Sequence, residues 1–311
     1  MTAAPSRHAL ALAALLLAGL AAGAEARPGT RFIDSMEFGG QQRYWLVNVP
    51  ASYDGTRAVP LVVRLHAAGG HFNSTEEHGW FPLSDQAGFI LVLPNGSLPS
   101  GTDGGLKWNV YSWDDGPDDV GFLVAVIERL RQQFRVDARR VFMTGHSNGA
   151  SMTNTFAFAH AEMLAAIAPA QGAWVTALGL DPHAVSPQPG VPLPVWIWRG
   201  ETENDLVGAL ARNLQDRQQQ QFWSGHDGCP APPEVRAETD GRFEYTTEVH
   251  QGCRAEVRFT EVRGKGHEYE PEYSAKIWNE FFARQVRAPT GRSPRPRLER
   301  APPAAPVPLG R

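Results

Sequence analysis

The sequence predicts a single α/β domain, built on a mostly parallel central sheet with helices on both faces. Apolar runs of strand length alternate along the chain with stretches whose apolar residues recur at helical spacing. The central runs are continuously apolar, as in strands that are buried on both faces. The length of 311 residues and the hydrophobic content of 42% suffice for one large core.

Strands and helices are expected to alternate from residue 44 onward. Strands are predicted at residues 44–49, 61–65, 89–93, 141–144, 166–168, 195–198 and 257–262. Helical patterns cover residues 120–134, 150–163, 208–222 and 272–286. Asp118 or Asp119 is available as the N-cap of the first helix. Because strands that alternate with helices form parallel sheets, this order supports the fold class.

Residues 1–26 predict a secretory signal peptide. Arg7 precedes an apolar run over residues 9–22, and the small residues Ala24 and Ala26 mark a cleavage site. The run is shorter than the roughly 20 apolar residues of a membrane span, so a membrane anchor is the weaker alternative. We therefore expect a secreted or periplasmic protein that has no membrane contact after cleavage.

The expected domain covers residues 27–286, and residues 287–311 have the composition of a disordered tail, rich in proline and arginine. The formal net charge of the chain is −4. The tail contributes +5 and residues 1–26 contribute nothing, which leaves −9 on residues 27–286. Such an acidic domain does not attract nucleic acid, and the basic tail is too short to form a binding domain.

The chain contains two cysteines, Cys229 and Cys253. An even count in an exported chain predicts one disulfide, and two unrelated buried thiols are the alternative. A metal site is not expected, because two isolated cysteines lack the paired C-x-x-C spacing. The sequence indicates no cofactor.

The sharpest local motif is Gly145-His146-Ser147-Asn148-Gly149, which lies between a strand pattern and a helix pattern. A G-x-S-x-G turn in this setting is typical of a nucleophile elbow, in which a sharp turn lifts the serine hydroxyl above the sheet. Glycines allow the close backbone approach that the turn requires. We predict Ser147 as the nucleophile and the amide of Asn148 as an oxyanion donor; a structural glycine turn is the alternative.

A second small-residue loop, residues 65–70, directly follows a predicted buried strand. Hydrolases with a nucleophile elbow place another oxyanion amide in such a loop, because the main chain must reach the substrate oxygen. We predict that this donor is the amide of Ala67. His66 is interpreted as a satisfied loop histidine rather than as a proton carrier.

The predicted base is His267, in the glycine-rich segment 264–268 between the last strand and the last helix. This position agrees with the chain order of serine, acid and histidine in α/β-hydrolases. The acid is expected in the loop after the strand at residues 195–198. Either Glu203 or Asp205 is able to accept the imidazole N–H there, and the alternative for each is a solvated carboxylate.

Two further clusters have competing interpretations. Trp108, Tyr111 and Trp113 are interpreted as the wall of an acyl pocket, with aromatic packing under a loop as the alternative. Four aspartates suggest calcium, but helix capping and a solvated turn explain them better. These four are Asp114, Asp115, Asp118 and Asp119.

On these motifs the chain resembles exported polyhydroxybutyrate depolymerases and feruloyl esterases, a carbohydrate-esterase-like family of α/β-hydrolases. The resemblance covers residues 43–282 and includes segments 118–122, 136–141 and 277–282. Family members carry an aspartate three residues after the glycine of a His-Gly loop; counting without gaps places Glu203 there, and a slip of two residues places Asp205. The chain departs from the family pattern in three places. His-Ala-Ala replaces His-Gly at residues 66–68, Arg199 stands where histidine is common, and Glu203 replaces aspartate.

The sequence therefore predicts a secreted serine carboxylester hydrolase that works through an acyl-enzyme and resembles polyhydroxybutyrate depolymerases. Residues 27–286 form its catalytic domain, and the substrate is a small-molecule or polymeric ester. A feruloyl or acetyl esterase that acts on plant polysaccharide is the alternative enzyme. A non-catalytic binding protein on a hydrolase scaffold is the alternative of another class.

Overall fold

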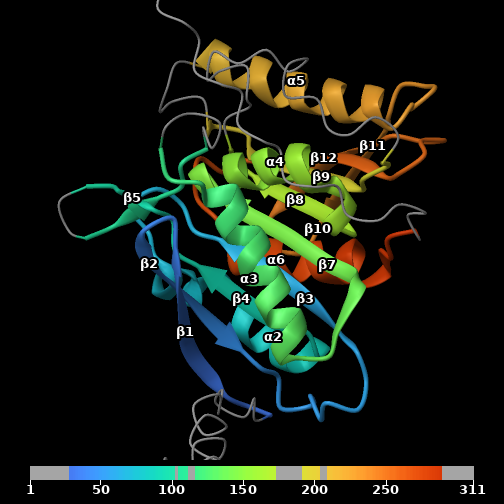
Figure 1. Ribbon diagram of the computed structural model, residues 1–311. Helices are drawn as coiled ribbons and strands as arrows, with labels where there is room; N and C mark the ends of the chain where they lie inside the picture. Colours follow the sequence, from blue (N-terminus) through green and yellow to red (C-terminus); the bar gives the residue numbers. More distant parts are fainter. Residues whose placement is uncertain (1–27, 102–103, 111–115, 173–190, 204–208, 289–311) are drawn as a thin grey trace, which may run out of the picture.

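The central sheet of the computed structural model contains ten strands in the order β1-β2-β4-β3-β7-β8-β9-β12-β11-β10 (Figure 1). The structure describes residues 28–101, 104–110, 116–172, 191–203 and 209–288. Within them the sheet strands are β1 (Arg31–Phe38), β2 (Gln41–Asn48), β3 (Val59–Leu65), β4 (Ile90–Pro94), β7 (Val136–His146), β8 (Ala166–Ala170), β9 (Val195–Gly200), β10 (Glu234–Thr239), β11 (Glu244–Val249) and β12 (Val257–Val262). A small separate sheet pairs β5 (Leu98–Pro99) with β6 (Leu106–Lys107).

The middle of the sheet is parallel and its two edges are antiparallel. β4, β3, β7, β8, β9 and β12 pair in parallel, whereas β1 and β2 on one side and β11 and β10 on the other are joined as antiparallel hairpins. The predicted mostly parallel sheet is thus confirmed. All six parallel strands end at one edge, so the loops that follow them gather there.

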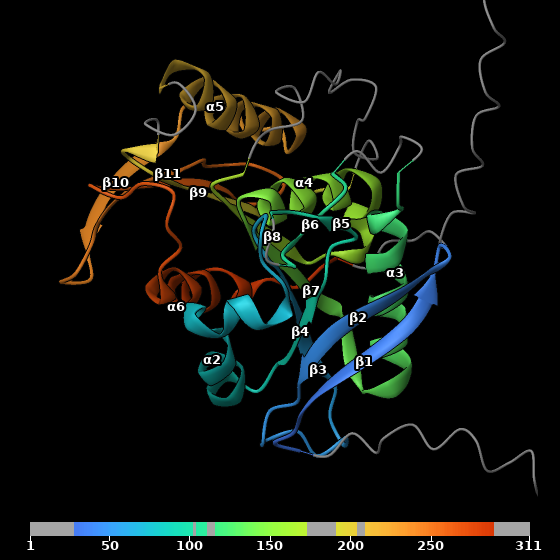
Figure 2. The same cartoon turned by 90° about the vertical axis from the view of Figure 1, so that its left-hand side faces the viewer.

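Helices cover both faces of this sheet (Figure 2). The helices are α2 (Trp80–Ala87), α3 (Asp119–Gln133), α4 (Asn148–His160), α5 (Ala209–His226) and α6 (Pro271–Glu280), with short 3₁₀ turns η1 (Phe72–His78), η2 (Ala161–Met163) and η5 (Phe282–Arg284). One apolar core lies beneath α3, α4 and α5, and the other beneath α2 and α6. Along β3, Leu61 and Val63 enter the first core while Val62 enters the second, as the alternation of a strand requires.

All seven predicted strands are present, but the sequence interpretation missed β1 at one edge of the sheet and the β10–β11 hairpin at the other. β10 is exposed along its whole length, so it has no apolar run to detect. The turn between β1 and β2 is Gly39-Gly40, both with positive φ, a tight hairpin signal that was readable from the sequence. The predicted helix over residues 272–286 is too long, because α6 ends at Glu280 and a 3₁₀ turn follows.

The predicted disulfide is confirmed: Cys229 is bonded to Cys253. It joins the chain just after α5 to the loop just before β12. Across the described ranges, no helix is both long enough and apolar enough to cross a membrane. The predicted signal peptide and nearly all of the predicted tail lie outside the described residues.

Candidate active site

Ser147 lies at a sharp turn between β7 and α4. Its φ of 54° and ψ of −118° are unusual for a residue with a side chain, as expected at a nucleophile elbow. The Ser147 amide donates to the carbonyl of Ala170, which ties the turn to the end of β8 (2.9 Å). A Cβ atom on Gly145 would lie 2.2 Å from the Gly149 oxygen, and one on Gly149 would lie 2.5 Å from the His66 oxygen. Both glycines of the motif are therefore sterically required.

Three of the predicted residues meet above the end of the sheet in a continuous hydrogen-bonded row. His267 Nε2 lies 2.8 Å from Ser147 Oγ, and His267 Nδ1 lies 2.8 Å from Glu203 Oε1. A carboxylate only accepts hydrogen bonds, so Nδ1 carries the proton and Nε2 accepts from the serine hydroxyl. The Glu203 side chain is 4% exposed, and that of His267 is 22% exposed. This geometry meets the requirements for nucleophile, base and orienting acid.

The loops that carry the acid and the histidine hold each other in place. The Thr202 amide donates to the Lys265 carbonyl (2.8 Å), and the Gly264 amide donates to the Glu201 carboxylate (2.7 Å). Gln171, just after β8, donates its side-chain amide to the Gly266 carbonyl (2.7 Å). Gln171 is buried and has a φ of 59°. Its role was missed because no local sequence feature distinguishes it.

The two predicted oxyanion amides lie on adjoining elements. Ala67 follows β3 and Asn148 begins α4, and β3 pairs with β7, the strand that leads into Ser147. Among the hydrogen bonds of the described residues, none is donated by the backbone N–H of Ala67 or by the backbone N–H of Asn148. Both N–H groups therefore stay available for a substrate oxygen.

Trp108, which is 1% exposed, connects the two elements that carry these amides. Its indole N–H donates to the His66 carbonyl (3.0 Å), and its backbone amide donates to Asn148 Oδ1 (2.7 Å). The His66 carbonyl and the Ala67 amide belong to one planar trans peptide, so they point in opposite directions. Trp108 thus packs under the loop, the alternative interpretation of that residue. Tyr111 and Trp113 lie outside the described residues.

The histidines around the triad are uncharged. His66 accepts from the Gly96 amide at Nε2 (2.9 Å) and donates from Nδ1 to the Ala67 carbonyl (2.8 Å). Burial lowers the pKa of His66 to about 4, which agrees with its interpretation as a satisfied loop histidine. The ring of His146 lies 5.0 Å from that of His267, and burial lowers the pKa of His146 to about 3. Both rings are therefore neutral at neutral pH, and neither places a positive charge beside His267.

Of the four aspartates, the two that the structure describes have structural partners. Asp118 caps α3 by accepting from the Gly121 amide (2.7 Å). Asp119 is fully buried, pairs with Arg43 (2.6 Å) and accepts from the Asn109 amide (2.7 Å). Asp114 and Asp115 lie outside the described residues, as does Asp205, the other predicted acid.

Comparison with known proteins finds similarity to esterases. Residues 45–181 match the family model of esterases of the PHB depolymerase type. The chain is 26% identical over 242 residues to feruloyl esterase B of Piromyces equi, covering 71% of this chain and 42% of that protein. It is 27% identical over 237 residues to a probable feruloyl esterase C of Aspergillus terreus, covering 74% of this chain and 77% of that protein.

A solved structure gives the same fold. The acetyl xylan esterase from Aspergillus awamori aligns with a TM-score of 0.64 at 19% identity, covering 81% of this chain and 99% of the other. The class is therefore that of an α/β-hydrolase-fold ester hydrolase. Within it, the chain is similar to esterases of the PHB depolymerase type over residues 45–181 and to feruloyl esterases over most of its length, in agreement with the resemblance of its motifs.

Proposed function

We propose that the chain is an exported serine esterase with Ser147 as nucleophile, His267 as base and Glu203 as the orienting acid. The observation that carries the proposal is a pair of hydrogen bonds made by the His267 ring. Its Nε2 lies 2.8 Å from Ser147 Oγ, and its Nδ1 lies 2.8 Å from Glu203 Oε1. The flanking histidines are neutral and buried, so His267 is the base best placed to take the serine proton.

The reaction follows from this arrangement. His267 takes the proton of Ser147, whose oxygen forms a bond to the ester carbonyl carbon. The amides of Ala67 and Asn148 stabilise the resulting oxyanion. As the tetrahedral intermediate collapses, His267 gives its proton to the departing alcohol, and an acyl-serine remains. Water then attacks the acyl carbon with His267 again as base, and the carboxylic acid and the serine hydroxyl are released.

The substrate is an ester of a carboxylic acid, and two candidate classes differ in what supports them. A hydroxyalkanoate polyester or oligoester is supported by the family model over residues 45–181. Feruloyl esters are supported by the two feruloyl esterases, whose similarity extends over more than two thirds of this chain. Acetyl esters of plant polysaccharide are supported by a shorter similarity, of 31% identity over 137 residues, to an acetylxylan esterase of Coprinopsis cinerea. The test is to compare the rates at which one preparation of the enzyme hydrolyses poly-3-hydroxybutyrate, methyl ferulate and acetylated xylan. The class of substrate that is hydrolysed fastest is the one that the enzyme prefers.

Labelling with a fluorophosphonate tests whether the protein is an enzyme at all. A serine activated by its base reacts, so we expect a single labelled peptide that contains Ser147. Ser147→Ala and His267→Ala should abolish both labelling and hydrolysis, because the triad acts as a unit. Ser224→Ala and His160→Ala, both away from the triad, are the matched controls. An unlabelled wild-type protein would instead favour a binding protein on a hydrolase scaffold.

Export is proposed from the signal sequence and agrees with the disulfide between Cys229 and Cys253. N-terminal sequencing of the mature protein from culture medium or periplasm should begin at Arg27. Recovery of the full-length chain from the cytoplasm alone would contradict export.

A further inference from the structure

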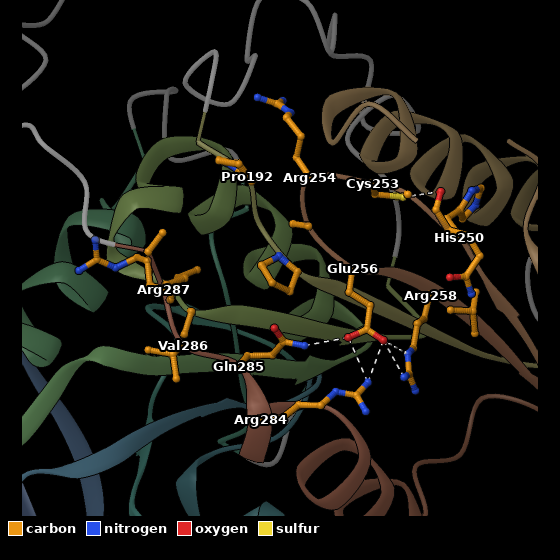
Figure 3. Close-up of a pocket in the computed structure, with 18 of the residues that line it drawn as sticks. Pro192, His250, Cys253, Arg254, Glu256, Arg258, Arg284, Gln285, Val286 and Arg287 are labelled. Carbon is orange, nitrogen blue, oxygen red and sulfur yellow. Dashed lines mark hydrogen bonds and ion pairs between the residues drawn. The ribbon is translucent and has the colours of Figure 1, made fainter. Parts of the chain in front are cut away.

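Figure 3 shows a hollow of about 610 Å³. Most of its lining precedes the parallel strands, so it lies at the opposite end of the sheet from the triad. Its lining comes from the residues just before β8, β9 and β12, from single residues of β10, β11 and β12, and from the end of η5 and the chain after it. Glu203 and His267 follow the other ends of β9 and β12. A six-residue strand spans about 20 Å, so this hollow is separate from the catalytic centre.

The hollow is strongly basic although the domain is acidic. The described residues that line it include one carboxylate, Glu256, and five arginines: Arg236, Arg254, Arg258, Arg284 and Arg287. Arg236 is neutralised by Glu234 (2.9 Å) just outside the lining, so four arginines face the single carboxylate of Glu256. Residues 27–286 carry a net charge of −9, so this concentration of positive charge runs against the trend of the domain. The chain beyond Ala288 adds five more arginines and one glutamate, and therefore supplies no excess of counter-charge. We call this hollow the basic pocket.

The centre of the basic pocket already holds one oxyanion, the carboxylate of Glu256. Arg258 and Arg284 lie 2.6 and 2.8 Å from its oxygens, and the side-chain amide of Gln285 donates to it over 2.8 Å (Figure 3). Three donors from two segments thus converge on one carboxylate. A single negative charge offsets only one of the two guanidinium groups, so the centre keeps a positive charge.

The basic pocket is also rigid. The guanidinium of Arg258 lies 4.9 Å from the Trp196 ring, which fixes its position. The Arg254 backbone amide donates to the Asp227 carbonyl (2.8 Å), and the neighbouring Cys253 is bonded to Cys229. Arg254 itself donates to a backbone carbonyl, that of His226. Donors held in place lose little conformational entropy when they bind an anion.

We propose that the basic pocket binds a multiply charged oxyanion of the phosphate class. Guanidinium groups match the planar faces of phosphate oxygens, and several of them together suit a ligand with more than one negative charge. A single carboxylate, the acetate ion for example, would leave most of the excess positive charge unbalanced.

Calorimetric titration at constant ionic strength tests the proposal, with inorganic phosphate, phenyl phosphate and acetate as the three ligands. Phosphate should bind at least about tenfold more tightly than acetate, because charge-assisted bonds multiply with ligand charge. Tighter binding of phenyl phosphate than of inorganic phosphate would assign the site to a phosphate group on an organic molecule. Equal binding would assign it to the free ion. Phosphate that binds no better than acetate would overturn the proposal.

Two substitutions should act in opposite directions. Arg284→Gln removes a donor and should weaken phosphate binding roughly fivefold, whereas Glu256→Gln removes the competing carboxylate and should strengthen it roughly threefold. A gain of affinity cannot arise from partial unfolding.

The matched controls are Arg263→Gln and Glu244→Gln. These two residues form an exposed ion pair (2.6 Å) near the other end of β12. Control effects as large as those in the basic pocket, or weaker binding by Glu256→Gln, would refute the site. Binding is measured without ester, so the result is independent of the proposed esterase activity.

Discussion

Trp108 donates its indole N–H to the carbonyl of His66 over 3.0 Å, and this contact orients the peptide whose other end is the proposed oxyanion amide of Ala67. The Trp108 backbone amide also holds the side chain of Asn148 (2.7 Å). One buried residue therefore contacts both the peptide of the Ala67 amide and the side chain of Asn148. We infer that Trp108 is a positioning residue, which does not touch the reacting atoms.

Trp108→Phe keeps an aromatic ring but loses the indole N–H. Complete loss of an oxyanion donor lowers kcat by roughly a hundredfold to a thousandfold, so misalignment of one should lower kcat by roughly tenfold to a hundredfold with little change in KM. Steady-state kinetics on a soluble ester measures this. Trp80→Phe is the control, because Trp80 is fully buried and its indole nitrogen has no partner in the described structure. Equal losses of kcat in the two variants would show that Trp108 contributes only to packing and does not position the oxyanion donors.

Glu203→Gln should lower kcat by roughly a thousandfold or more, since the amide neither fixes the His267 tautomer nor stabilises the imidazolium. Glu201→Gln is the matched control: Glu201 is exposed, lies two residues away and does not contact the imidazole. Glutamine keeps a side-chain oxygen that accepts from the Gly264 amide, so the contact between the two loops is preserved. Asp205→Asn should have a modest effect. A larger loss in Asp205→Asn than in Glu203→Gln would transfer the role of acid to Asp205.

Asp227 should make the free energy of unfolding depend on pH. Its carboxyl group is fully buried, accepts from the Leu193 amide (3.3 Å) and lies 4.0 Å from His226 Nε2. Burial raises the pKa of Asp227 from 3.8 to about 7. The folded chain thus keeps a proton that the unfolded chain releases, so this contribution is complete below pH 4 and is lost as the pH rises through 7.

Asp227→Asn imitates the protonated carboxyl group at every pH. Chemical denaturation should show the variant close to wild type near pH 4. At pH 8 it should be more stable by about 4 kcal/mol, which is the size of the pKa shift expressed as free energy. A difference between wild type and variant that does not change with pH would contradict the assignment.

The disulfide should contribute to stability without affecting catalysis. Cys229 and Cys253 are 24 residues apart, and closing a loop of this size stabilises the fold by about 3 kcal/mol on the chain-entropy model. The double variant Cys229→Ser, Cys253→Ser should lose about this much free energy of unfolding while kcat at 25 °C is unchanged. Reduced wild-type protein should match the double variant. A large fall in kcat in the folded double variant would show that the bond also supports the active site.

Much of the fold was predictable because its signals are local. The central strands are continuously apolar, and the helix over residues 120–134 repeats its apolar residues every third or fourth position. Edge strands such as β10 gave no such signal, because an exposed strand needs no apolar residues. α2 was missed as well, because eight residues are too few for a clear helical period.

For the candidate site, the sequence by itself determined the elbow around Ser147, where a tight turn excludes any side chain from Gly145 and Gly149. The choice of His267 was also readable from the sequence, because its loop follows the last strand along the chain, after the serine and the acid. Which side chains contact one another depends on the tertiary structure. Glu203 contacts His267 across 64 residues, and Trp108 reaches His66 across 42. The basic pocket likewise draws on β10, the start of β12 and the chain after η5. Such contacts depend on the order and register of the parallel strands, which bring distant loops to one edge, and no short stretch of sequence encodes that arrangement.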